Sequence, residues 1–381
     1  MLQLLDITHM RPPSEDLRRF ILEDARKPTE GLARRVIERF GISRQTVSAN
    51  IRRLVALGLL EETAVGREKK YRLASRDLGN WTIPLAGLRE DVVWRERLAP
   101  LLAALPENVR GIWQYGFTEM VNNAIDHSGG TRLNVWAWEN ALDTEVWITD
   151  DGEGIFHRIQ RILELYDPRE AILELAKGKL TTDPDNHTGE GIFFTSRAFD
   201  HFSILSRTLY FSHNRDRQDW LIEDEGDSPG TQVRLVLSKT CDYTMQSIMD
   251  QYATPDEFAF NKTVVPVTLA RHEGEKLVSR SQAKRLVARF ERFKTVVLDF
   301  KGVEEIGQAF ADEIFRVFAT SHPGVDLISI HVEPPVQQMI DRALTNKMIG
   351  AEPLRAVATG LINTSAVGMQ RRTPPEDEGK A

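Results

Sequence analysis

The stretch from Gly111 to Ile155 places the strongest constraint on what this chain can fold into. It starts with a helical pattern, passes through a turn of small residues, and ends in an acidic loop rich in glycine. Between these, two alternating runs over 133–138 and 145–149 predict a β-hairpin. This order of elements indicates a domain of the α+β class.

Three polar side chains share one face of the predicted helix. Glu119 and Asn123 are four residues apart, and Asp126 follows three residues later, so all three project from the same side. A carboxylate beside an amide oxygen suits a hard cation such as Mg²⁺, which takes few protein ligands and keeps water and phosphate oxygens as the others. The helix therefore carries candidate ligands for magnesium and a phosphate compound.

Glycines recur at three later points. The loop Asp150-Asp151-Gly152-Glu153-Gly154 follows an apolar strand, and its paired glycines allow a planar ligand to approach closely. Gly189 and Gly191 stand at a predicted helix start, where free N–H groups and the helix dipole favour phosphate. Gly230-Thr231 precedes an alternating strand over 232–237. The order of these motifs along the chain is a far more specific sign of a phosphate-ligand site than any single motif.

With these motifs the chain resembles the GHKL (Bergerat-fold) ATP-binding domain shared by gyrase, Hsp90, histidine kinases and MutL. Glu119-x-x-x-Asn123-Ala124 resembles the family's N box, Asp150-x-Gly152-x-Gly154 its first glycine box, Gly189-x-Gly191 its second and Gly230-Thr231 its last. The resemblance implies ATP and Mg²⁺ as cofactors. It also implies an α/β sandwich in which helices cover one face of a mixed antiparallel sheet.

The resemblance also implies roles for single residues. Glu119 would polarise a water molecule or an attacking hydroxyl, Asn123 would hold Mg²⁺ against the phosphates, and Asp150 would accept a hydrogen bond from the adenine amino group. The other predicted nucleotide contacts are Asp126, the pocket-shaping glycines Gly152 and Gly154, the lid glycines Gly189 and Gly191, Thr231 at the pocket base, and Lys177. From the lid, Lys177 would reach the γ-phosphate, and an exposed solubilising charge is the alternative.

Positive charge is concentrated at the start of the chain. The whole protein has a net charge of −7, yet residues 1–80 carry 16 Lys and Arg against 11 Asp and Glu, an excess of five positive charges. This imbalance predicts a polyanionic partner for the first domain alone.

Residues 14–73 show three helical patterns followed by a hairpin pattern. Ser43 is the predicted N-cap of the third helix, in which Val47, Ile51, Leu54 and Leu57 have core spacing. The segment resembles a winged helix-turn-helix domain of the bacterial repressor type, which implies DNA as a partner. Residues facing bases or phosphates would be Ser43, Arg44, Gln45, Thr46, Ser48, Asn50, Arg52 and Arg53, with Arg67, Lys69 and Lys70 in the wing. A winged helix that binds protein is the alternative.

Strand and helix patterns alternate from Asn261 to about Leu344, which predicts a small α/β domain. The segment from Val296 to Gly307 resembles the STAS-like fold of anti-sigma-factor antagonists, in which a loop presents a phosphorylatable serine at a helix start. Here the loop reads Ile306-Gly307-Gln308-Ala309-Phe310, without Ser or Thr. We therefore expect this domain to bind a protein partner or to sense a signal.

These patterns predict a multidomain α+β protein. Its 381 residues, 41% of them hydrophobic, suffice for two or three domains with their own cores. The predicted parts are a winged helix-turn-helix (1–78), a linker with a coupling helix (79–106), the GHKL domain (107–242), the STAS-like domain (258–355) and a disordered tail (356–381).

No apolar run approaches the roughly 20 residues that span a bilayer, and residues 1–10 lack the features of a signal peptide. The single cysteine, Cys241, excludes an internal disulfide. We expect a cytoplasmic protein without membrane contact.

The combined prediction is a cytoplasmic, DNA-binding transcriptional regulator that binds and slowly hydrolyses ATP. Its nucleotide state would alter the geometry of a homodimer and hence the spacing of two winged helices. Two alternatives stay open. One is a serine/threonine protein kinase of the anti-sigma-factor type, and the other is an ATP-driven clamp in DNA repair or phage defence.

Overall fold

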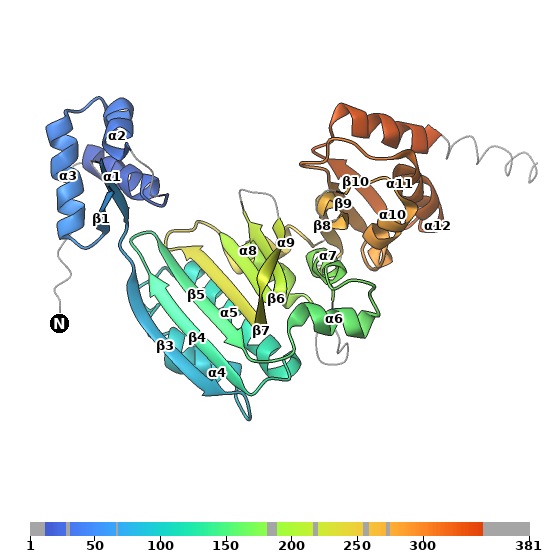
Figure 1. The fold of residues 1–381 in the computed structure, drawn as a ribbon, viewed down its shortest axis with the longest axis horizontal. Helices are drawn as coiled ribbons and strands as arrows, with labels where there is room; N and C mark the ends of the chain where they lie inside the picture. The colour runs from blue at the N-terminus through green and yellow to red at the C-terminus, as the bar shows by residue number, and fades with distance from the viewer. Residues whose placement is uncertain are drawn as a thin grey trace, which may run out of the picture. The chain divides into compact units, whose positions relative to one another are not determined.

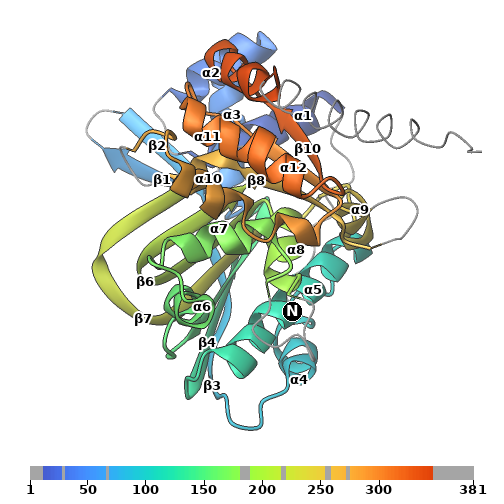
Figure 2. The ribbon, with the colours of Figure 1, turned by 90° about the vertical axis from the view of Figure 1, so that its right-hand side faces the viewer.

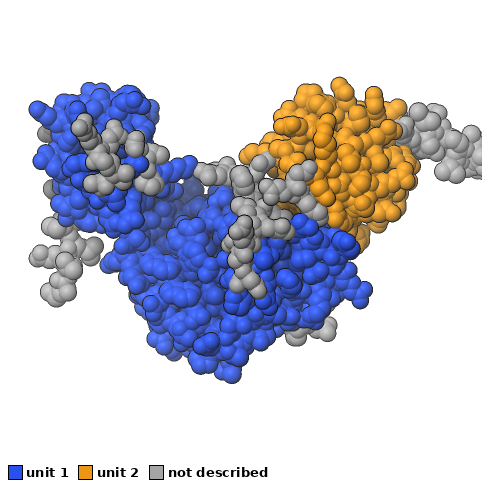
Figure 3. Space-filling model, viewed as in Figure 1, with its two compact units in different colours: residues 1–263 blue, residues 264–381 orange. Residues whose placement is uncertain are grey.

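The computed structural model describes residues 12–27, 31–65, 68–180, 189–215, 220–253, 259–271 and 275–345. The chain forms two compact units, residues 1–263 and 264–381, coloured separately in Figure 3. The predicted tail over 356–381 and the predicted DNA contact Arg67 lie outside the described residues.

The first unit starts with helices α1 (Pro12–Asp24), α2 (Leu32–Phe40) and α3 (Arg44–Ala56), followed by the antiparallel hairpin β1 (Leu60–Val65) and β2 (Glu68–Leu73). Ser43 caps α3, since its Oγ accepts a hydrogen bond of 3.2 Å from the Thr46 backbone N–H. Val47, Ile51 and Leu54 are buried in the core of these helices, as predicted. Leu57 is 45% exposed instead, because it follows the last residue of α3.

A five-stranded sheet forms the centre of the first unit, in the order β3-β4-β5-β7-β6 (Figure 1). The strands are β3 (Arg76–Pro84), β4 (Arg132–Glu139), β5 (Asp143–Asp150), β6 (His201–Asn214) and β7 (Trp220–Ser238). Every described pairing is antiparallel, so the expectation of a mixed sheet was wrong. The strand expected over 232–237 is part of the longer strand β7, whose register against β6 shifts near Arg207.

The expected linker over 79–106 contributes to this sheet. Its first residues lie in β3, where Trp81 pairs with Val135 of β4. It continues through α4 (Glu90–Val93) and a π-helical turn (Trp94–Leu98), in which Leu98 is buried. The ring of Trp94 lies 6.1 Å from that of Phe117. β3 lies at the sheet edge and alternates only weakly in burial, so its residues give a poor strand signal.

Helix α5 (Glu107–His127) packs against β5, β7 and α8 (Gly191–Ala198), and Figure 2 shows α5 and α8 on one face of the sheet. Its apolar residues recur at intervals of three and four, which buries one broad face. Gly116 permits close packing of the two helices, since a Cβ there would lie 2.3 Å from the Phe199 ring. The remaining helices are α6 (Ile155–Leu163), α7 (Glu170–Lys177) and α9 (Met245–Asp250).

A three-stranded sheet in the order β10-β9-β8 lies in the second unit, apart from the first two residues of β8, which belong to the first. The strands are β8 (Lys262–Pro266), β9 (Thr295–Asp299) and β10 (Asp326–Ile330), and β9 and β10 are parallel. The helices are α10 (Arg280–Val287), a continuous helical segment made of α11 (Gln308–Asp312), a π-helical stretch (Glu313–Phe318) and α12 (Ala319–Ser321), and a final helix over 334–345. Strand–helix alternation over this region was predicted correctly. Across the described part of the chain, no helix has both the length and the apolar character needed to cross a membrane.

Candidate functional site

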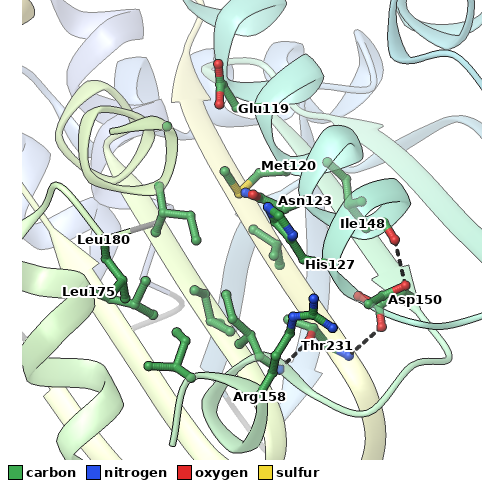
Figure 4. A pocket seen from close by; sticks show the side chains of 18 of the residues that line it. Glu119, Met120, Asn123, His127, Ile148, Asp150, Arg158, Leu175, Leu180 and Thr231 are labelled. Atoms are coloured by element: carbon green, nitrogen blue, oxygen red, sulfur yellow. Dashed lines mark hydrogen bonds between the residues drawn. The ribbon is translucent and has the colours of Figure 1, made fainter. Parts of the chain in front are cut away.

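A cavity of about 280 Å³ brings the predicted motifs together within the first unit (Figure 4). Polar groups reach it from α5, from the end of β5, from the start of α8 and from β7, namely Glu119, Asn123, Asp150, Gly189, Gly191 and Thr231. The rest of the wall is largely apolar, formed by residues such as Met120, Ile148, Ile159, Leu175, Phe193 and Val233. A concave apolar wall with a few convergent polar groups is typical of a small-molecule site.

Asp150 is the buried acid of this cavity. Its side chain is at the end of β5, and the residue is 7% exposed. Oδ1 accepts hydrogen bonds from the backbone N–H groups of Gly152 (2.9 Å) and Thr231 (3.2 Å). Burial raises the pKa of Asp150 to about 6, against the lowering effect of these two N–H groups. No described residue donates a hydrogen bond to Oδ2.

Thr231 connects the β7 segment to the loop after β5. Its N–H donates to Asp150, and its Oγ1 accepts a hydrogen bond of 3.0 Å from the Ile155 backbone N–H. The preceding residue must be glycine for two reasons. Gly230 has φ of +75°, and a Cβ there would lie 2.0 Å from the Asp150 carbonyl oxygen. Gly230-Thr231 therefore fixes the position of the buried carboxylate.

Gly152 and Gly154 do not line the cavity but allow the loop beside it to pack closely. A Cβ on Gly152 would lie 2.1 Å from the Ser128 carbonyl oxygen, and Gly154 has φ of +92°. Asp151 holds the loop on its outer side, where Oδ1 accepts hydrogen bonds from the backbone N–H groups of Thr131 and Arg132. These donors keep the pKa of Asp151 well below its usual range.

The other end of the cavity is acidic. A Cβ on Gly191 would lie 1.9 Å from Glu119 Oε2, so this carboxylate lies against the first turn of α8. Burial raises the pKa of Tyr115, and the negative charges of Glu119 and Glu190 raise it further. An anionic ligand group bound at this end would therefore lie close to the Glu119 carboxylate.

Asn123 lies between the two ends on the cavity side of α5. Its Nδ2 is buried and has no hydrogen-bond partner. Rotation of the amide by half a turn would present Oδ1 instead, so this side chain can offer either a donor or an oxygen ligand. Among the described residues there is no cluster of three or more His, Cys, Asp or Glu that could hold a metal alone. An ion bound at Asn123 would thus need further oxygens from a ligand and from water.

His127 and Arg158 line the cavity but were not among the predicted contacts. His127 lies one helical turn after Asn123, and this spacing of four residues predicts that both side chains face the cavity. Arg158 of α6 reaches the cavity with its Nε buried and unpartnered, while its Nη1 donates to Glu153 over 2.9 Å. It shares a helix face with Ile155, three residues earlier, which places both beside the cavity.

Two predicted contacts lie elsewhere. Asp126 is exposed and does not line the cavity, because it lies on the outer side of the last turn of α5. Lys177 is fully buried, and its Nζ lies 2.5 Å from Glu174. Because α7 is buried on all its sides, this lysine is neither exposed nor directed into the cavity.

The predicted DNA-contacting residues lie on and around α3. Those that are exposed are Ser43, Arg44, Gln45, Thr46, Arg52, Arg53 and Lys69, while Ser48, Asn50 and Lys70 are half-buried. The ammonium of Lys69 lies 2.7 Å from the Glu62 carboxylate, which raises the pKa of Lys69 and offsets its charge. The exposed positive charge therefore lies mainly on α3.

Comparison with known protein families identifies one region. Residues 282–337 match the family described as a STAS-like domain of unknown function (DUF4325), which confirms the prediction of a STAS-like domain in the second unit. No curated protein matches the chain.

Proposed function

We propose that the cavity of the first unit binds ATP together with Mg²⁺, in a domain of the GHKL type. The buried Asp150 carboxylate carries this proposal. Two backbone N–H groups orient its Oδ1, and Oδ2 is left to accept a hydrogen bond from the amino group of adenine. Guanine would present a carbonyl oxygen at the same position, and the carboxylate would repel it.

The phosphates would lie at the acidic end, near Gly189 and the first turn of α8. Mg²⁺, when bound, would neutralise the phosphate charge there. Asn123 and phosphate oxygens would hold the ion, which fits the small protein ligand set that Mg²⁺ accepts. Glu119 would orient a water molecule or another hydroxyl towards the terminal phosphate. This arrangement suits slow ATP hydrolysis.

We propose further that residues 12–73 form a winged helix that binds duplex DNA, so that the protein is a nucleotide-dependent regulator. The support is the row of exposed polar and basic side chains at the start of α3, together with the positive charge of residues 1–80. The STAS-like second unit would bind a protein partner or sense a signal.

Titration calorimetry with ATP and GTP, with and without Mg²⁺, tests the nucleotide proposal. We expect ATP to bind more tightly than GTP. We expect Asp150→Asn to weaken ATP binding at least about tenfold, since a hydrogen bond to a buried charged group contributes roughly 1.5–3 kcal/mol. Asn123→Ala should lose the Mg²⁺-dependent part of the affinity. Asp126→Asn makes the same chemical change outside the cavity and should bind as the wild type does.

Equal affinities of wild type and Asp150→Asn would overturn the adenine assignment. With γ-labelled ATP, release of free phosphate by the wild type alone, and not by Asn123→Ala, would support hydrolysis. Label on protein would favour the kinase alternative instead.

Fluorescence anisotropy of labelled duplex DNA, measured with and without ATP, tests whether the protein is a nucleotide-dependent regulator. If ATP leaves the DNA affinity unchanged at fixed salt, this regulatory role is excluded.

A further inference from the structure

Four aromatic rings meet beside the first turn of α8. Phe193 and Phe194 belong to α8, whereas Tyr252 and Phe260 come from the segment after α9. The ring centroid of Phe260 lies 4.7 Å from that of Phe193 and 4.9 Å from that of Phe194, and the Tyr252 centroid lies 5.0 Å from that of Phe193. Phe193 also lines the cavity. The cluster therefore joins the cavity wall to a segment 60 residues further along the chain.

The same segment is tied to the end of α7. Lys179 Nζ donates a hydrogen bond of 3.2 Å to Asn261 Oδ1, and Thr263 Oγ1 donates one of 2.7 Å to the Lys177 carbonyl oxygen. Thr263 is fully buried, so this hydrogen bond is shielded from water. Two residues that follow Phe260 thus have defined positions relative to the end of α7.

Phe260 fits its place because Gly178 lies beside it. A Cβ on Gly178 would lie 2.8 Å from the Phe260 ring, and Gly178 has φ of +81°. Phe260 is only 7% exposed, so nearly all of its surface is buried. Only Asn261 separates it from Lys262, the first residue of β8 in the three-stranded sheet.

We propose that Phe260 and Tyr252 are positioning residues for the phosphate end of the cavity. By holding Phe193, they fix the first turn of α8, whose Gly191 faces Glu119. The segment that leads into the second unit thereby contributes to the nucleotide site of the first. This inference rests on the proposed function, because it assigns the phosphates of the bound nucleotide to that end.

The test compares ATP with adenosine, which lacks the phosphates. In the full chain, Phe260→Ala should weaken Mg²⁺–ATP binding roughly five- to tenfold, the loss expected for an aromatic contact. Adenosine affinity should change less than about twofold, since the Asp150 end is untouched. Phe260→Leu keeps most of the packing volume and should restore most of the ATP affinity. A parallel loss for both ligands, or no loss for ATP, would overturn the proposal.

Hydrogen exchange of the ligand-free protein gives a second readout that does not depend on nucleotide. Phe260→Ala should speed the exchange of amides in α8 while those of β4 and β5 exchange as in the wild type. Unchanged exchange in α8 would overturn the positioning role even if ATP binds. The wild type could bind neither ATP nor adenosine while Phe260→Ala still speeds amide exchange in α8. In that case the nucleotide proposal fails, but the packing role of Phe260 stands.

Discussion

Two adjacent carboxyl groups show how strongly the surroundings of a residue determine its chemistry. Asp150 is buried, and this raises its pKa to about 6. Asp151 is on the outer side of the loop, where hydrogen bonds from Thr131 and Arg132 lower its pKa. Asp150 is therefore suited to ligand recognition, whereas Asp151 stabilises the loop. At both positions the sequence shows only an aspartate.

The raised pKa of Asp150 predicts a pH-dependent stability. The pKa rises from 3.8 to about 6 on folding, so the folded protein binds more protons than the unfolded chain between these values. The contribution of Asp150 to the free energy of unfolding therefore falls as the pH rises from about 4 through 6. Asp150→Asn removes this loss and should be more stable than the wild type by up to about 3 kcal/mol at pH 7.5, with little difference at pH 4.

Urea unfolding at the two pH values measures this difference. Asp126→Asn is the control, because Asp126 is exposed and its substitution should change stability little at either pH. If the free energy of unfolding of Asp150→Asn differs from that of the wild type by the same amount at pH 4 and pH 7.5, then folding does not raise the pKa of Asp150. If Asp150→Asn is more stable at pH 7.5 and also binds ATP more weakly, then Asp150 serves ligand binding at a cost in stability.

Two glycines give a second test at the residue scale. Gly230→Ala places a Cβ against the Asp150 carbonyl oxygen at a positive φ, and should destabilise the protein by at least about 3 kcal/mol. Gly111→Ala makes the same change in α5, where no atom apart from the neighbouring backbone of the helix lies within 4 Å of the new Cβ. It should stabilise by roughly 0.5–1 kcal/mol through helix propensity. A urea midpoint of Gly230→Ala at or above that of the wild type would contradict the close packing at Gly230.

Among the elements, β5 connects the cavity to the N-terminal helices. It ends at Asp150 and begins at Asp143, whose Oδ1 lies 2.6 Å from Arg26 Nη2, just after α1. In the turn before β5, Ala141 and Leu142 pack against the core of the N-terminal helices. The N-terminal domain is thus attached to the strand that carries the buried carboxylate.

A double-mutant cycle can measure this attachment. Asp143 is largely buried and Arg26 is half exposed, so we expect a coupling energy of about 1 kcal/mol between them. The pair Arg34 and Glu38, both exposed on α2, is the matched control and should couple by less than about 0.5 kcal/mol. Equal coupling in the two cycles would mean that the Arg26–Asp143 pair is no stronger than a surface ion pair.

At the scale of the whole molecule, the chain divides into two compact units. The cavity belongs to the first unit alone, whereas the region matched by the STAS-like family lies in the second. Ligand binding adds free energy of unfolding only to the part that contains the ligand site. The proposed function therefore has a consequence for the unfolding of the full chain.

Scanning calorimetry should show two transitions, and Mg²⁺–ATP should raise the temperature of only one. At a free ATP concentration 100 times the Kd, the stabilisation of the first unit should be about 2.7 kcal/mol. The Asn123→Ala variant should show a smaller shift at the same concentration. Equal shifts of both transitions would indicate that the two units unfold as one cooperative block.

Local sequence patterns were sufficient to predict the elements that depend on neighbouring residues. The helical pattern of α5 and the alternation of β4 and β5 were predicted correctly, since periodicity and backbone preference act over a few neighbouring residues. Asn123 and Asp150 were selected as site residues for the same reason. The structure places both in one cavity.

Which side chains are buried, and which groups they contact, depends on the packing of elements that are distant in the chain. β3 is a strand because β4, some 50 residues later, pairs with it. Lys177 is buried by elements packed around α7, and Arg158 reaches the cavity because α6 packs against α7 and β6. Burial and electrostatic surroundings are set by residues distant in the chain, so no local pattern contains them.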